Sequence, residues 1–324
     1  TGTEGTDYGT ISDITITAGN TTGTTTFTPT DDNVYEGNET AIVAISGVSG
    51  GSASESGSQS VTLTINENED GPKVTLSSSA SSIAENAGSA LTLTATLSVA
   101  TTGNVTVSIS TSGTSTEGTD YSTISDITIS EGDTTGTVSF TPSDDSVYEG
   151  NETAVVAISS VTGLATEEGT QALTLTITEN ESAPTVTLTA SASSIAENAG
   201  SSLTLTATLS GVVDENVTVS ISTLGTGTEG TDYGTISDIT ISAGNTTGTA
   251  SFTPTDDSIY EGNETGIVAI SGVSGGGATE SGSQSETITI TDNDAAPTVD
   301  FNSTASTGAE VVSSKAITVD LSAA

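Results

Sequence analysis

DDSVYEGNET, residues Asp144–Thr153, is the stretch around which the chain is organised. It carries two Asp and two Glu side chains, and no lysine or arginine lies near it in the sequence. Close copies begin at Asp31 (DDNVYEGNET) and at Asp256 (DDSIYEGNET). Crowded carboxylates repel one another unless a cation neutralises them, and calcium accepts about six to eight oxygen ligands in irregular geometry. The recurrence therefore favours a calcium-binding loop over a solvated acidic turn.

Composition excludes several classes of function. The 324 residues include 42 Asp and Glu but only two basic residues, so the formal net charge is -40, and nucleic acids and anionic membranes are poor partners. The absence of Cys and His removes disulfides, thiolate or imidazole metal sites and Ser-His-Asp chemistry. No apolar run is long enough to span a membrane, and a secretion signal is absent or lies outside this sequence.

Repeats the size of one sandwich domain divide the chain. The motif EGTDY begins at Glu4, Glu117 and Glu229, which are separated by about 112 residues. A proline recurs at the same step and marks the boundaries. We expect residues 1–71 to be a repeat that lacks its first strands, 72–183 and 184–296 to be complete repeats, and 297–324 to be the opening strands of a further repeat.

Apolar residues in each repeat alternate with Thr and Ser, which is the period of a half-buried β-strand. In the second repeat the alternation predicts strands over 91–97, 105–109, 127–129, 138–140, 156–158 and 173–177. No segment has the apolar period of a helix. The predicted fold class is all-β, with tandem immunoglobulin-like, seven-stranded β-sandwich domains that are nearly free of helix.

Loops gather at the two ends of a sandwich, so carboxylates far apart in sequence can converge there. In the second repeat these acids are found at four places. One follows the first strand, one is the Asp of EGTDY, four lie in the DDSVYEGNE loop, and two lie in the motif that closes the repeat. Their formal charge would be neutralised by about three or four calcium ions. Because the expected core is small and poor in aromatic residues, bound metal would also add stability.

Four motifs in this order resemble the Calx-beta domain, the calcium-binding module of sodium/calcium exchangers, an integrin subunit and many bacterial surface proteins. They are IAENAG (83–88), EGTDY (117–121), DDSVYEGNE (144–152) and TITENE (176–181), and the last reads TITDND (289–294) in the third repeat. The resemblance covers nearly the whole chain. It implies several calcium ions in each domain.

The resemblance also implies the metal ligands. In the second repeat they are Glu85, Asp120, Asp144, Asp145, Glu149, Glu152, Glu179 and Glu181. In the third repeat they are Glu197, Asp232, Asp256, Asp257, Glu261, Glu264, Asp292 and Asp294. The first repeat offers Asp7, Asp31, Asp32, Glu36, Glu39, Glu67, Glu69 and Asp70, and the final fragment keeps Glu310. Where the closing motif has Glu for Asp, the longer side chain is expected to weaken or rearrange one site.

Catalytic alternatives fail on the residues present. GVSGG at Gly47 and Gly272 fits a nucleophile motif, but the chain has no His to activate its serine. A glycosidase needs a cleft with aromatic platforms, and three similar copies with only 6 Tyr and 4 Phe in all make a poor one. Asn38, Asn151 and Asn263 lie in glycosylation sequons, where a loop-forming role is favoured over a glycan. The chain is therefore expected not to be an enzyme.

Three functions remain open. The favoured one is a structural calcium-binding repeat protein, located outside the cell or at its surface, whose calcium-stiffened domains form a rigid filament or stalk with neighbouring copies or repeats as partners. The second is an adhesin-type module for cell-surface or carbohydrate ligands, and the third is a calcium sensor. Near-identical repeats favour the first, because each unit then performs the same task.

The two ends of the chain admit two explanations. The tail from Thr298 matches the opening of a repeat, and the head begins in the middle of one. Either the tail strands of one chain complete the head of the next, or the sequence is part of a longer array. Tail and head together still lack the strand expected over 105–109, which a sandwich needs to cover its core. A longer array is therefore favoured.

Overall fold

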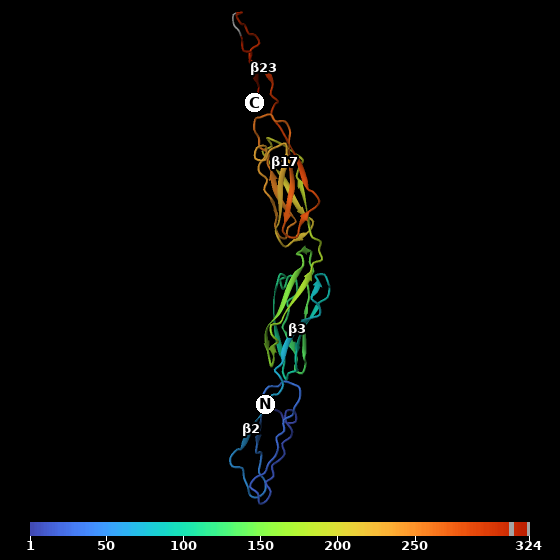
Figure 1. Cartoon of the computed structure of the whole chain (residues 1–324), viewed down its shortest axis with the longest axis vertical. Helices are drawn as coiled ribbons and strands as arrows, with labels where there is room; N and C mark the ends of the chain where they lie inside the picture. The colour runs from blue at the N-terminus through green and yellow to red at the C-terminus, as the bar shows by residue number, and fades with distance from the viewer. Residues whose placement is uncertain (311–313, 323–324) are drawn as a thin grey trace. The chain divides into compact units, whose positions relative to one another are not determined.

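The computed structural model describes residues 1–310 and 314–322, and these residues form strands and turns without a helix. The all-β prediction is confirmed (Figure 1). The chain divides into two compact units, one made of Thr1–Asp144 and Asn151–Thr178, the other of Asp145–Gly150 and Glu179–Ala324. A search of the described part of the chain for a membrane-spanning helix found none.

Two sheets form the second repeat, within the first unit. The four-stranded sheet has the order β11-β3-β5-β8, with β3 (Lys73–Ser78), β5 (Leu91–Leu97), β8 (Thr135–Phe140) and β11 (Thr166–Glu167). The five-stranded sheet has the order β4-β12-β10-β6-β7, with β4 (Ser82–Ala84), β6 (Val105–Gly113), β7 (Ile127–Ile129), β10 (Glu152–Thr162) and β12 (Ala172–Thr178). Every strand that the alternation predicted is present.

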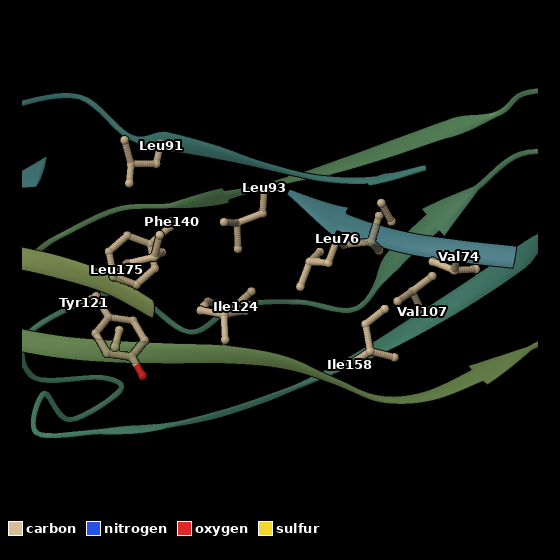
Figure 2. Packing of buried hydrophobic residues seen from close by; sticks show 14 of the residues in the cluster. Val74, Leu76, Leu91, Leu93, Val107, Tyr121, Ile124, Phe140, Ile158 and Leu175 are labelled. Carbon is tan, nitrogen blue, oxygen red and sulfur yellow. The ribbon is translucent and has the colours of Figure 1, made fainter. Parts of the chain in front are cut away.

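The core of this repeat consists of the inward positions of both sheets. Along β5 the apolar residues are buried and the threonines between them are exposed or half-buried, as the period of two requires. Phe140 and Tyr121 stack with their ring centroids 4.8 Å apart, and both side chains are buried (Figure 2). The tyrosine of EGTDY is therefore a core residue, which places the preceding Asp120 at the edge of the sandwich.

The third repeat has the same topology, within the second unit. Its four-stranded sheet contains β13 (Thr185–Ala190), β15 (Leu203–Leu209), β19 (Thr247–Phe252) and β21 (Thr279–Glu280). Its five-stranded sheet contains β14 (Ser194–Ala196), β17 (Val217–Gly225), β18 (Ile239–Ile241), β20 (Glu264–Ser274) and β22 (Ser285–Thr291). The short strands β9 (Val147–Tyr148) and β16 (Val212–Val213) form a further parallel pair.

The first repeat and the tail contain fewer strands. The first repeat holds the pair β1 (Glu39–Ala44) and β2 (Ser60–Ile65), and its Ile14 and Ile16 are 56% and 58% exposed. Their equivalents in the second repeat are fully buried. In the described part of the tail, β23 (Val299–Phe301) and β24 (Val319–Leu321) pair in the register of β3 and β5.

Glycine at the end of β17 is required by its surroundings. Gly225 has a φ of +124°, and a Cβ there would lie 2.0 Å from the carbonyl oxygen of Thr265. Gly225→Ala is therefore expected to destabilise the third repeat by about 1–3 kcal/mol. Gly272→Ala, where the space for a Cβ is open, is the matched control. Urea unfolding with hydrogen exchange of β17 and β20 compares them, and equal effects would contradict the steric account.

Candidate metal centre

Three strands of the third repeat end at one pole of the sandwich and bring its acidic residues together. Glu197 directly follows β14, and its backbone N–H donates to the carbonyl of Thr291 at the end of β22 (3.0 Å). Asp292 and Asp294 come directly after β22, while Glu264 is the first residue of β20. Because β14 runs parallel to β22 and β20 runs antiparallel to it, these residues share one pole.

The acidic loop is held by its own carboxylates. Asp257 Oδ1 accepts a hydrogen bond from the backbone N–H of Ile259 (2.7 Å). Asp292 Oδ2 accepts from the backbone N–H groups of Glu261 (2.8 Å) and Gly262 (2.6 Å). The loop therefore has a defined conformation, which directs its remaining carboxylates toward the pole.

Two groups of carboxylates share Glu197. In one group Glu197, Asp257 and Glu261 each offer an oxygen within 4.8 Å of the others, and in the second Asp292 and Asp294 do so with Glu197. Glu197 is only 7% exposed. A cavity of about 10 Å³ lies beside it, lined by Glu197, Asp232, Thr255, Glu261, Gly262, Glu264, Ile290 and Asp292. The cavity is the size of a single water molecule or ion.

The electrostatics of this pole divide its acids into two kinds. Burial, followed by the negative charges of neighbouring acids, raises the pKa of Glu197, Glu261, Glu264 and Asp294 above their ordinary values. Asp292 differs, because hydrogen bonds from the backbone of Asp294, Gly262 and Glu261 lower its pKa against the opposing effect of burial. Amides thus stabilise one acid as an anion, while burial and mutual repulsion disfavour the charged form of the others, an effect that a bound cation would offset.

The first repeat assembles an equivalent group. Asp7, Glu36 and Glu39 bring carboxylate oxygens within 4.8 Å of one another. Burial, followed by the charge of Asp7, raises the pKa of Glu36. Burial is the largest influence on Glu67 but is outweighed by hydrogen bonds from Glu69 and from the amides of Glu36 and Gly37, which lower its pKa to about 2. Glu67 therefore corresponds to Asp292, an acid stabilised as an anion by amides, and Glu36 corresponds to the acids whose pKa is raised.

Acids of the second repeat fall in both compact units. Glu85, Asp120, Asp144 and Glu152 belong to the first unit, and Asp145, Glu149, Glu179 and Glu181 belong to the second. Within the second unit, Glu179 Oε2 accepts from the backbone N–H groups of Glu149 (2.7 Å) and Gly150 (2.9 Å). These are the bonds that Asp292 makes in the third repeat. The longer glutamate therefore leaves the anchoring of the loop unchanged.

Glu229, Asp70 and Glu310 have other surroundings. Glu229 of the third EGTDY accepts hydrogen bonds from the Thr223 hydroxyl (2.6 Å) and the Ile236 amide (2.9 Å). Asp70 is exposed and lines an open hollow of about 590 Å³ together with Lys73, and Glu310 is exposed between β23 and β24. Exposure alone does not set them apart, because Asp257 and Glu261 at the pole of the third repeat are exposed as well.

The asparagine of YEGNET has a role in holding the acidic loop that the sequence pattern did not predict. Asn38 Oδ1 accepts the backbone N–H of Glu67 (2.9 Å), and Asn263 Oδ1 accepts that of Asp292 (3.2 Å). In both repeats the amide ties the loop to the first acid of the closing motif. Its recurrence in every copy of the loop was the signal that could have identified this role.

The residues present fit a hard divalent cation. Asp294 Oδ2 and Glu39 Oε2 are buried oxygens without a hydrogen-bond donor in the described structure. The lysines do not supply one, since Lys73 donates to the Thr166 hydroxyl and Lys315 to the carbonyl of Thr307. A donor set made of carboxylate oxygens suits calcium, which takes oxygen ligands in flexible geometry.

Several solved structures are similar to this chain at low sequence identity. Among solved structures, CBD12 from CALX1.2 is 14% identical over 68% of this chain and 99% of that one, with a TM-score of 0.32. The adhesin InvE of Yersinia pseudotuberculosis is 14% identical over 68% of this chain and 58% of that one, with a TM-score of 0.31. No curated protein sequence matches.

A family model covers most of the sequence. The model of the Calx-beta domain matches residues 1–69, 67–181 and 179–294 in succession. These matches contain the three acidic loops and the three closing motifs described above. The chain belongs to the Calx-beta domain family.

Proposed function

We propose that the chain is a calcium-binding structural protein whose repeats are stabilised by calcium at their acidic poles. The observation that carries the proposal is the pair of carboxylate groups around the buried Glu197, together with the buried oxygen of Asp294 that lacks a donor. Calx-beta domains bind calcium, and the retained acids supply the same chemistry here.

Calcium would act at this pole by neutralising acids that otherwise repel one another. Glu197, Glu264 and Asp292 belong to the ends of three different strands, so a shared cation would tie those ends together. Binding to the folded chain alone raises stability by mass action, by about 2.7 kcal/mol at 100 times the dissociation constant. In a chain without Cys, such sites take the place that disulfides occupy in many secreted domains.

We further propose a filament or stalk at the cell surface or outside the cell, with other repeats of the same kind as its partners. Every repeat carries the acidic loop and a closing motif, and each closing motif lies only a few residues before the next repeat begins. Calcium at these positions would reduce repulsion at the junctions. This supports a mechanical role in preference to an enzymatic one.

Removing one proposed ligand should weaken calcium binding. Glu264→Gln keeps the shape of a side chain that lines the polar cavity but removes its charge. Calorimetric titration is expected to show a lower stoichiometry or an affinity reduced by about 10-fold or more. Glu286→Gln on β22 is the matched control, because the other repeats have Val61 and Leu173 at this position. Identical titrations of the two variants would refute the site.

The raised pKa values predict the pH dependence of the calcium-free chain. A carboxyl group whose pKa is higher when folded stabilises the fold as it becomes protonated. Glu197, Glu261 and Glu264 therefore predict that unfolding temperature rises as the pH falls from about 7 to about 5. Below about 4 the lowered pKa of Asp292 reverses the trend.

Saturating calcium provides the comparison for that experiment. Bound calcium requires ionised ligands, so stabilisation by the metal should decline over the same fall in pH. Differential scanning calorimetry with calcium and with chelator measures both curves. A calcium-free chain that loses stability between about pH 7 and pH 5 would contradict the assignment of the raised pKa values.

Calcium should also change the flexibility of the whole chain. Small-angle scattering is expected to report a stiffer particle in millimolar calcium and a more flexible one in chelator, because unscreened acids at successive junctions repel. Magnesium at equal ionic strength is the control for general screening. Superimposable profiles in calcium and chelator would remove support for the filament role while leaving calcium binding open.

A further inference from the structure

The apolar pair at the centre of each acidic loop is not explained by metal binding. The pairs are Val34–Tyr35, Val147–Tyr148 and Ile259–Tyr260, and each lies between carboxylates proposed to bind calcium. Large apolar side chains in a charged loop are costly to expose. Because the pair recurs in all three loops, we expect another surface to cover it.

The second loop shows where its pair goes. Val147 and Tyr148 belong to the second compact unit and pair in parallel with Val212 and Val213, at the edge of the third repeat. Tyr148 packs against the hydrophobic core of that repeat. Its ring lies so close to Gly277 that a Cβ there would approach the Tyr148 Cε1 atom to 2.5 Å. Glycine at 277 thus leaves room for the ring.

The first loop makes the equivalent contact within the first unit. The backbone N–H of Tyr35 donates to the carbonyl of Ala100 (3.1 Å), and Tyr35 forms a parallel bridge with Thr101. Ala100 and Thr101 occupy the positions of Val212 and Val213 in the alignment of the repeats. Two different loops therefore dock on the same edge of the repeat that follows them.

The third loop has the same internal structure but an exposed pair. Ile259 and Tyr260 are 49% and 45% exposed. The amide of Ile259 is bonded to Asp257 as that of Val147 is to Asp145 (both 2.7 Å). The internal hydrogen bond of the loop is therefore the same whether its apolar pair is covered, as in the second loop, or exposed, as in the third.

We propose that the apolar pair of each acidic loop is a docking element for the next repeat of the same kind, held in its docked position by cations bound to the carboxylates on either side. Strand addition through the backbone supplies the attachment, and the tyrosine ring supplies contact area. Ile259–Tyr260 would dock on the matching edge of a further repeat. The coupling to cations rests on the proposed function, whereas the docking itself does not.

Hydrogen exchange of the full chain tests the docking. Tyr148→Ala is expected to raise exchange at Val212, Val213 and Ala278 by about 10-fold or more, because the ring that packs the added strand against this repeat is lost. Tyr260→Ala is the matched control, an exposed tyrosine in a nearly identical loop, and should leave exchange at these positions unchanged. Equal exchange in the two variants would overturn the docking role.

Repeating the exchange with calcium and with chelator tests the coupling. Chelator is expected to raise exchange at Val212 and Val213 in the unsubstituted chain and to have little further effect in Tyr148→Ala. If calorimetry detects calcium binding but exchange does not respond, the coupling is wrong and the proposed function stands. If no calcium binds, the proposed function fails, and the two tyrosine variants still decide the docking.

Discussion

Repulsion among carboxylates held at one pole of each sandwich is the constraint on which the rest of the arrangement depends. Hydrogen bonds from backbone amides offset part of this repulsion. Asp292 accepts hydrogen bonds from three amides, those of Glu261, Gly262 and Asp294, and is stabilised as an anion without metal. The anchored acid fixes the loop, and its own charge then raises the pKa of Glu197 and Asp294 beyond the effect of burial. The fold thus builds the candidate cation site by anchoring one acid and crowding the others around it.

Much of the fold could be predicted because apolar residues alternate with Thr and Ser along most of its strands. Ile127–Ile129 was predicted to the residue, whereas β10 extends from Glu152 to Thr162, well beyond the apolar positions 156 and 158 that indicated it. At its ends the ladder includes polar residues such as Thr153, Ser160 and Thr162, whose backbone groups pair equally well. Strand ends depend on such pairing, and the apolar pattern of a single sequence does not encode it.

The sequence could predict which acids converge at the candidate site, but not which of them is anchored by backbone amides. The convergence of Glu197, Asp257 and Asp292 follows from the loops that meet at a sandwich pole. Which acid is anchored depends on the direction of backbone amides, which the sequence alone does not give. Glu179 accepts hydrogen bonds from the amides of Glu149 and Gly150 as Asp292 does from those of Glu261 and Gly262, so either side-chain length can anchor the loop.

The docking pairs show why nearly identical sequences have different surroundings. Tyr148 and Tyr260 lie in loops that differ by one apolar residue, yet the first is half-buried and the second is exposed. The receiving edge is also variable, since Ala100 and Thr101 in one repeat correspond to Val212 and Val213 in the next. Backbone pairing tolerates this variation because it is independent of side-chain identity. A loop that attaches through its backbone and binds cations through its carboxylates can therefore serve every junction of a repeat protein with little change in its own sequence.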